Sequence, residues 1–310
     1  MEYCNTHNIA TFCKSFVPIT YDLQISKERI AFFRQLPCDN TPNHEWLLKT
    51  MEHMGDGIYF IKNSNYLRNF YLSKQEQNIS NPHCIIEDAY DIEQNLERES
   101  VAQQLIKSAR INNSTFHIRA FMYVANYANP LIVLYAGSVV LRSTDPREIR
   151  TNWHQRKANF TGNVYAYILN LTQVSNYFGE AFDARDIIAQ IKSATKILFL
   201  AAFEKNIPQK HTRVQHHMMP VLDFIVTDEF KVKWLDYNNP GGSYPTHCFE
   251  ETETKFGIKV SLSDYWGCTQ GKRMMEEMIN IQIEIAIKKR NKQALDQLDS
   301  IKSFEVIVWE

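Results

Sequence analysis

The chain has 310 residues, a formal net charge of −1 and 44% hydrophobic residues. Its length and hydrophobic content suffice for one large or two modest domains with a packed core, and a near-zero charge gives no electrostatic footprint for nucleic acid. No secretory signal and no stretch long enough to span a membrane is visible. Six cysteines without a CxxC pair favour free thiols, so we expect a cytoplasmic protein, or one of the host cytosol if it comes from a pathogen or a virus.

An early strand pair carries the first candidate binding residue. Trp46–Lys49 and Ile58–Ile61 are predicted strands, and Gly55-Asp56-Gly57 lies between them. Lys49, at a strand end beside this glycine loop, can reach phosphate oxygens as a point charge. An ordinary surface lysine beside a hairpin turn is the alternative interpretation.

An arginine lies in the middle of a predicted strand. The apolar residues of Glu97–Ala109 recur at helical spacing and predict a helix, and Phe116–Val124 then alternates like a half-buried strand centred on Arg119. A buried arginine needs an acidic or phosphate partner, and an internal ion pair is the plain alternative to a binding role.

Two strands and two long helices follow. Leu131–Tyr135 and Ser138–Arg142 are predicted strands with Ala136-Gly137 as the turn between them. Asp183 caps a predicted helix, and Gly271–Leu298 is a second one. Each helix has one apolar face, made of Ile187, Ile191, Ala194 and Leu198 in the first and of Met274, Met278, Ile281 and Ile285 in the second.

A late hairpin carries two carboxylates and an amide. Val221–Val226 and Lys231–Tyr237 are rich in β-branched and aromatic residues and flank a short polar turn. Asp223 interrupts the first strand, and an unpaired carboxylate there is expensive to bury. Asp236 and Asn238 are two residues apart, so they project from one face if the strand continues that far.

Oxygen-bearing side chains that converge from paired strands are what a hard divalent cation needs. Because three protein oxygens leave room for waters and nucleotide phosphates, magnesium with ATP is the natural interpretation of this hairpin. An ordinary surface hairpin with a turn-capping aspartate and asparagine is the alternative.

Four histidines invite a zinc hypothesis, which we do not adopt. Their spacing fits no tetrahedral ligand pattern, and two adjacent histidines need not face the same way. They are His211, His216, His217 and His247.

Taken together and in order, seven segments resemble motifs of one enzyme family. They are WLLK (46–49), GDGI (55–58), FHIRAFMYV (116–124), YAGSVVLRST (135–144), NLTQVSNYF (170–178), VLDFIV (221–226) and KVKWLDYNNP (231–240). They are similar to the WIxKP, RGKGI, KFDLR, HLTN, FDFMVD and VWLIEVNxxP motifs, and to the strand after KFDLR, of the tubulin tyrosine ligase-like family of the ATP-grasp superfamily. The late hairpin and the arginine strand are the more specific parts.

The resemblance implies an α+β protein with an ATP-grasp fold, in which two α+β subdomains clasp a nucleotide. It predicts a reduced N-terminal cap over residues 1–44 and a central subdomain over residues 45–92. The C-terminal subdomain would cover residues 93–310 and include the last helix and strand.

The resemblance also implies a nucleotide site. Lys49 would hold the ATP phosphates, and the segment with Glu87, Asp88 and Tyr90 would be the hinge that lies on the adenine. Thr172 would lie near the nucleotide.

Metal and substrate residues follow from the same resemblance. Asp223, Asp236 and Asn238 would bind Mg²⁺, with aspartate where the family usually has glutamate. Arg119 would hold a substrate carboxylate or the developing acyl phosphate, and Arg142 would be a second, less secure arginine because its register is off by one.

The implied activity is an ATP- and Mg²⁺-dependent carboxylate–amine ligase that adds an amino acid to a protein or peptide through an acyl phosphate. Thr115 and His117 stand where the family has lysine and aspartate, and the basic residues of its glycine loop are missing. A degenerate ATP-grasp protein that acts as a binding module is therefore an alternative. A peptide-crosslinking ATP-grasp ligase is another.

Overall fold

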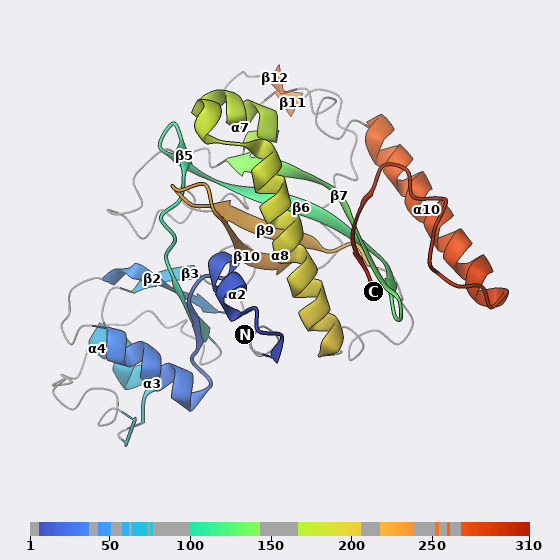
Figure 1. Ribbon diagram of the computed structural model, residues 1–310. Coiled ribbons are helices and arrows are strands. Elements are labelled where there is room, and N and C mark those ends of the chain that lie inside the picture. The colour runs from blue at the N-terminus through green and yellow to red at the C-terminus, as the bar shows by residue number, and fades with distance from the viewer. Residues whose placement is uncertain are drawn as a thin grey trace. The chain divides into compact units, whose positions relative to one another are not determined.

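The computed structural model of the protein describes residues 6–36, 43–50, 58–61, 64–73, 75–76, 100–142, 167–205, 218–238, 252–253, 259–260 and 268–310. The chain forms two compact units (Figure 1). The sheet unit comprises residues 1–16, 116–142 and 167–310, and the aromatic unit comprises residues 17–115 and 143–166. Helices occur beside antiparallel sheets, which confirms the α+β class. The division into a cap and two ATP-grasp subdomains stays a prediction.

The aromatic unit contains a four-stranded antiparallel sheet in the order β1-β4-β2-β3. Its described elements are β1 (Thr20–Asp22), α3 (Ser26–Gln35), β2 (Asn43–Thr50), β3 (Ile58–Ile61), α4 (Ser64–Tyr71), β4 (Ser100–Gln104) and β5 (Arg110–Ile111). The predicted strands at 46–49 and 58–61 are confirmed as β2 and β3, which pair with each other.

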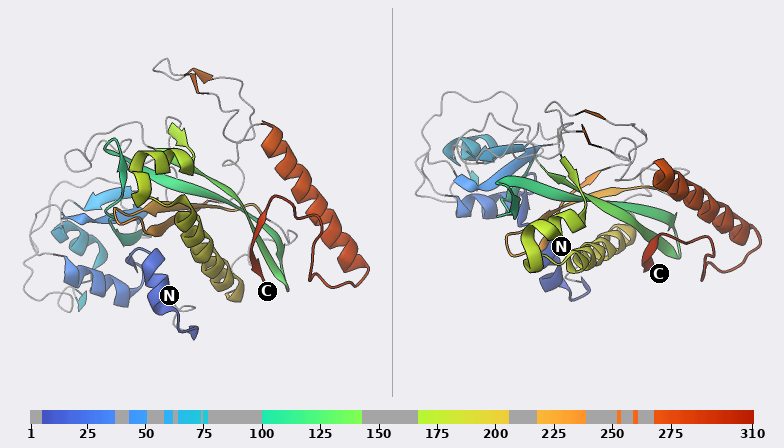
Figure 2. Two further views of the ribbon diagram at one scale, coloured as in Figure 1. Left: turned by 45° about the horizontal axis from the view of Figure 1, so that its top comes forward. Right: turned by 90° about the horizontal axis from the view of Figure 1, so that it is seen from above.

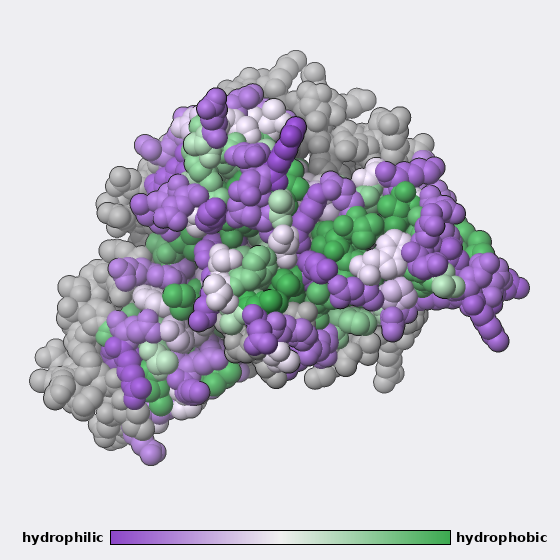
Figure 3. All heavy atoms as spheres, viewed as in Figure 1, coloured by the Kyte–Doolittle hydropathy of each residue, from purple (hydrophilic) through white to green (hydrophobic). Residues whose placement is uncertain are grey.

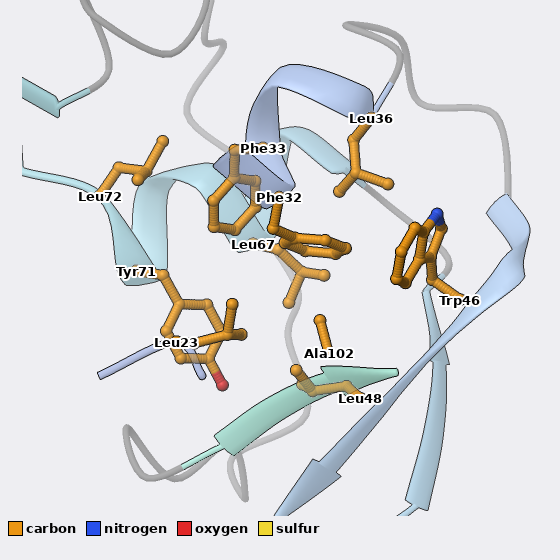
Figure 4. Packing of buried hydrophobic residues seen from close by; sticks show 10 residues of the cluster. All are labelled: Leu23, Phe32, Phe33, Leu36, Trp46, Leu48, Leu67, Tyr71, Leu72 and Ala102. Carbon is orange, nitrogen blue, oxygen red and sulfur yellow. The ribbon is translucent and has the colours of Figure 1, made fainter. Parts of the chain in front are cut away.

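Aromatic and leucine side chains from α3, α4 and the sheet form the core of this unit. Figure 4 shows the cluster: Leu23, Phe32, Phe33, Leu36, Trp46, Leu48, Leu67, Tyr71, Leu72 and Ala102. The rings of Phe32 and Trp46 pack edge to face with their centroids 5.3 Å apart, an arrangement that the quadrupoles of aromatic rings favour. Arg68 is fully buried beside them and donates to the carbonyl oxygens of Phe33 and Leu36.

The helix predicted over Glu97–Ala109 is wrong within its described part. Ser100–Gln104 is the central strand β4, which pairs with β1 and β2. Ala102 is fully buried there, because a central strand has neighbours on both edges. Pairing with β1 and β2 therefore decided the secondary structure of this segment, and the helical spacing of its apolar residues did not.

The sheet unit is built on a seven-stranded antiparallel sheet with the path β10-β9-β6-β7-β13, to which β5 and β8 add at β6 and β7. The remaining strands are β6 (Ser114–Tyr127), β7 (Leu131–Arg142), β8 (Tyr167–Leu169), β9 (Val221–Val226), β10 (Val232–Asn238), β11 (Thr252–Glu253), β12 (Lys259–Val260) and β13 (Glu305–Trp309). The arginine strand and the late hairpin are thus confirmed as strands. The turn predicted at Ala136-Gly137 is wrong, since β7 runs through both residues with an irregular register, and Gly137 has a φ of 128°.

Helices α7 (Leu171–Phe178) and α8 (Ala184–Glu204) cover one face of this sheet (Figures 1 and 2). Asp183 caps α8 and accepts a hydrogen bond from the Arg185 backbone N–H at 2.8 Å, as predicted. Phe178 of α7 packs on Phe116 of β6, with ring centroids 6.2 Å apart. The short helices α2 (Ala10–Phe16) and η1 (Gly179–Ala181) belong to the same unit.

The C-terminal helix α10 (Cys268–Arg290) packs against the far end of β6 and β7. The C-terminal core combines strand, helix and tail residues: Tyr123, Ala125, Ile132, Leu134, Met278, Ile281, Ile285, Leu295, Leu298 and Phe304. The helix ends at Arg290, whereas the sequence predicted Leu298. Lys292 adopts a positive φ of 54°, which turns the chain back so that Leu295 and Leu298 cover the helix.

Two expectations about environment can be compared with the structure. Among the described residues, no helix is long and apolar enough to cross a membrane. Cys13 is fully buried and disulfide-bonded, so the expectation that the cysteines are free is wrong at this residue. Sequence spacing does not report which cysteines come within bonding distance in the fold.

Candidate functional site

The candidate site is centred on an ion pair between two neighbouring strands. Arg119 of β6 lies directly across from Asp223 of β9 in the register of the sheet. Its Nε donates to Asp223 Oδ1 at 2.9 Å and its Nη2 to Oδ2 at 2.8 Å, which is the two-pronged pairing that a guanidinium makes with a carboxylate. The carboxylate that looked expensive to bury is therefore paired.

Strand alternation explains why this pair lies on the face opposite α7. Successive side chains of a strand point to opposite faces, and Phe116 points toward Phe178 of α7. His117 and Arg119 are one and three residues further along, so they project from the other face. Near Arg119, the side of the sheet that faces α7 is therefore apolar, and the opposite side carries His117, Arg119 and Asp223.

A bulge in β10 places a second carboxylate across from Asp223. Trp234 pairs with Phe224, and the register then shifts so that Asp236, not Leu235, faces Asp223. A one-residue shift reverses the face on which a side chain lies, and without it the apolar Leu235 would oppose the carboxylate. Asp236 is exposed, and its Oδ1 accepts the backbone N–H of Tyr237 at 2.8 Å.

Asn238 completes the cluster two residues beyond Asp236. Its Nδ2 donates to Asp223 Oδ2 at 2.8 Å. The structure therefore brings Arg119, Asp223, Asp236 and Asn238 together on three adjacent strands. We call these four residues the polar cluster.

His117 is a neighbour of the polar cluster that the sequence treated only as a departure from a family pattern. Its side chain is 9% exposed, and its Nε2 lies 3.5 Å from Asp223 Oδ1. Within the described part of the chain this nitrogen has no hydrogen-bond partner. The signal that could have found it is the two-residue spacing to Arg119, which puts both on one face.

Charges within the cluster keep the ion pair ionised. Burial alone raises the pKa of the Asp223 carboxyl, but the hydrogen bonds and positive charge of Arg119, with the His117 ring nearby, outweigh it and hold that pKa well below its usual range. Burial lowers the pKa of the Arg119 guanidinium, and the carboxylates of Asp223 and Asp236 outweigh that effect and raise it. The pair is therefore charged at neutral pH.

The donor atoms of the cluster fit a hard divalent cation. Within the described residues no three His, Cys, Asp or Glu side chains form a metal-binding group, so a cation here depends on the Asn238 amide as well as on two carboxylates. Asp236 is exposed, and among the described residues the Arg119 Nε–H is the only group within 3.0 Å that donates a hydrogen bond to Asp223 Oδ1. Rotating the Asn238 amide by half a turn presents its oxygen, and two carboxylates with an amide oxygen are ligands that Mg²⁺ accepts beside water and phosphate.

The remaining predicted residues lie elsewhere in the fold or outside the described residues. Thr172 is exposed in the first turn of α7, after the N-cap Asn170. Lys49 is half-buried near the end of β2, across from Val101 of β4. Arg142 is the last residue of β7, and its side chain lies outside the described part; so do the hinge residues Glu87, Asp88 and Tyr90.

Comparison with known proteins assigns no family: no family model matches the chain, and a search of curated proteins finds no match. The atoms of the polar cluster themselves therefore indicate what it can bind. They are an exposed carboxylate, an amide that can rotate to present its oxygen, and a positively charged guanidinium beside a buried carboxylate.

Proposed function

We propose that the protein is an ATP- and Mg²⁺-dependent carboxylate–amine ligase with an ATP-grasp fold, which joins an amino acid to a protein or peptide. The observation that supports this most is the polar cluster, because it combines cation ligands with an arginine on adjacent strands. The order of the sequence motifs supports it independently. Lys49, the hinge residues Glu87, Asp88 and Tyr90, and Thr172 are proposed to hold the nucleotide.

Arg119 is proposed to bind the substrate carboxylate. A guanidinium has five N–H donors, and two of those of Arg119 are used on Asp223, which leaves three for a ligand. Its side chain is 20% exposed, so these donors can reach the open face. Fixing the guanidinium with Asp223 orients it before the substrate arrives, which lowers the entropy cost of binding.

Asp223, Asp236 and Asn238 are proposed to hold magnesium. A magnesium ion held by these residues would supply positive charge to the phosphates of ATP, so that the γ-phosphoryl group could pass to the carboxylate with ADP as the leaving group. An amine would then displace phosphate from the acyl phosphate. Arg119 would then stabilise the oxyanion that forms during the attack, through charge-assisted hydrogen bonds. Arg142 is proposed as a second arginine for this step.

The test is ATP turnover in the presence of mixed amino acids and candidate acceptors, with mass spectrometry of the products. Asp236→Ala and Asn238→Ala each lower turnover by at least about 100-fold, because each removes a proposed ligand of the ion. Glu229→Ala is the matched control, since Glu229 is an exposed acid in the turn of the same hairpin. Full turnover in both ligand variants would exclude the proposal, whereas a crosslink within one peptide would point to the peptide-crosslinking reaction.

A second candidate, a binding module without catalysis, is favoured by the hydrogen bonding of Asp223. Both of its oxygens already accept hydrogen bonds, and the His117 Nε2 lies 3.5 Å from Asp223 Oδ1, a position that a cation would have to share. A protein of this kind binds a partner and shows no ATP turnover. Nucleotide binding discriminates, because the module gives no thermal shift with millimolar Mg-ATP.

A further inference from the structure

Three isoleucines of α10 are exposed in a row. Ile279, Ile283 and Ile287 have exposed fractions of 55%, 52% and 52%. They are four residues apart, so they lie one above another on the helix. Figure 3 shows hydrophobic residues reaching the surface along α10 between hydrophilic ones. We call these three residues the isoleucine stripe.

The isoleucine stripe is not part of the core that holds α10 in place. Met278, Ile281 and Ile285 face the C-terminal core and are at most 6% exposed. A helix turns about 100° per residue, so the stripe lies on the opposite side of α10 from these residues. The exposed fractions of the isoleucine stripe show that no described element covers that side of the helix.

Opposite charges flank the stripe at equal distances. Glu276 and Arg290 are both exposed, and each is seven residues, about two helical turns, from Ile283. Ile279 and Ile287 are each four residues from Ile283. Between residues 276 and 290, where the side chains of α10 are described, the exposed face therefore has an acid at one end, a base at the other and Ile283 at the centre.

We propose that this face binds a second copy of the chain, with two α10 helices packed antiparallel about a two-fold axis at Ile283. The axis places Ile283 against its own copy, Ile279 against Ile287 of the partner subunit, and Glu276 against Arg290 of the partner subunit. Such an interface is self-complementary, as a two-fold dimer requires. A parallel pair would instead place like charges together.

The charge pattern selects this occupant over an unrelated protein. A surface for a basic or an acidic partner carries one sign of charge, whereas this one carries both signs in mirror-related positions. One helix face on each copy makes a small interface, so the dimer forms and dissociates with concentration. The polar cluster lies on β6, β9 and β10, and the isoleucine stripe lies on α10. The inference therefore does not depend on the proposed function.

Sedimentation equilibrium of the full chain, over about 5 to 200 µM, tests the proposal. Wild type shifts from monomer to dimer across this range. Ile283→Glu weakens the dimer about 30-fold or more, because it removes the central apolar contact and places two carboxylates together. Ile19→Glu is the matched control, since Ile19 is also 52% exposed but lies outside α10, and it leaves the dimer unchanged.

Charge reversal tests the antiparallel arrangement. Glu276→Arg alone and Arg290→Glu alone each weaken the dimer about 3- to 10-fold, because two attractive pairs become repulsive. The double variant restores wild-type association, since each pair is then reversed but still opposite in sign. The melting temperature of each variant is measured alongside, so that loss of fold is recognised.

Three results would overturn the proposal. One is a wild-type chain that stays monomeric at 200 µM, which would leave the stripe to another partner. The second is a folded Ile283→Glu variant that dimerises like wild type. The third is a double charge reversal that adds the two single losses instead of cancelling them.

Discussion

Two buried carboxylates of the sheet unit have different surroundings. Asp223 accepts hydrogen bonds from a guanidinium and an amide side chain, on a sheet face that carries further polar groups. Glu277 of α10 accepts the backbone N–H groups of Lys302 at 2.6 Å and of Ser303 at 2.9 Å, as well as the Ser303 hydroxyl. The exposed fractions of the two residues are 7% and 8%, so burial does not distinguish them.

The difference lies in what each partner has left to offer. Each backbone N–H group has a single hydrogen to donate, so the groups bound to Glu277 have none left for a ligand, and this carboxylate holds the chain in place before β13. The guanidinium bound to Asp223 keeps three donors for a ligand, and Asp236 lies beside it. A buried carboxylate thus indicates a binding site only when its partners remain able to bind something else.

Removing Asp223 should have the largest effect. Asp223→Ala leaves the guanidinium of Arg119 largely buried without its partner, which costs about 3 to 5 kcal/mol of unfolding free energy. Guanidinium chloride unfolding measures this loss. The double variant Asp223→Ala with Arg119→Met should recover part of it, and an Asp223→Ala loss below about 1 kcal/mol would contradict the account of the pair.

Glu277→Gln should cost less and leave ligand binding intact. The glutamine side chain keeps one acceptor oxygen, but its NH₂ group faces N–H donors and cannot accept from them. We therefore expect the free energy of unfolding to fall by about 1 to 2 kcal/mol. Asp296→Asn, an exposed acid in the tail after α10, is the control and should cost nothing measurable. A Glu277→Gln variant that loses nucleotide binding would erase the distinction between the two carboxylates.

The Glu277 contribution should depend on pH. Burial raises the pKa of its carboxyl, but hydrogen bonds from Ser303, Lys302 and Phe304 outweigh it and lower the pKa. Because the pKa of Glu277 is lower in the folded protein than in the unfolded chain, where it is near 4.3, the ionised carboxylate stabilises the fold at pH values above about 4.3. This stabilisation is lost as the pH falls toward the pKa of the folded protein. The unfolding free energy of wild type minus Glu277→Gln should therefore be constant near neutral pH and shrink below about pH 4.5.

Arg119→Lys should have the smallest effect on stability and a clear one on catalysis. Lysine keeps the charge beside Asp223 but cannot make the two-pronged contact and present donors elsewhere, so stability falls by about 1 kcal/mol. ATP turnover should fall at least about 10-fold. Equal turnover in both proteins would argue against a substrate contact by Arg119.

Much of the sheet unit could be predicted from the sequence, because its patterns are long and local. The hairpin strands, the arginine strand and the Asp183 cap followed from alternation and from helix-capping chemistry. The strand over Ser100–Gln104 was missed, since its identity depends on strands far away in the sequence.

The polar cluster was only partly predictable. The spacing of Asp236 and Asn238 put them on one face, but the bulge that brings Asp236 rather than Leu235 across from Asp223 has no local signature. The pairing of Arg119 with Asp223 joins residues 104 positions apart, and sequence alone offered an ion pair without naming its partner.

Isothermal titration of the protein with Mg²⁺ and a non-hydrolysable ATP analogue tests the central claim most directly. Wild type and Glu277→Gln should bind alike, while Asp236→Ala and Asn238→Ala should lose at least about 10-fold in affinity and keep the wild-type melting temperature without nucleotide. Binding of equal strength in all four proteins, or in none, would contradict the assignment of the polar cluster to a magnesium nucleotide.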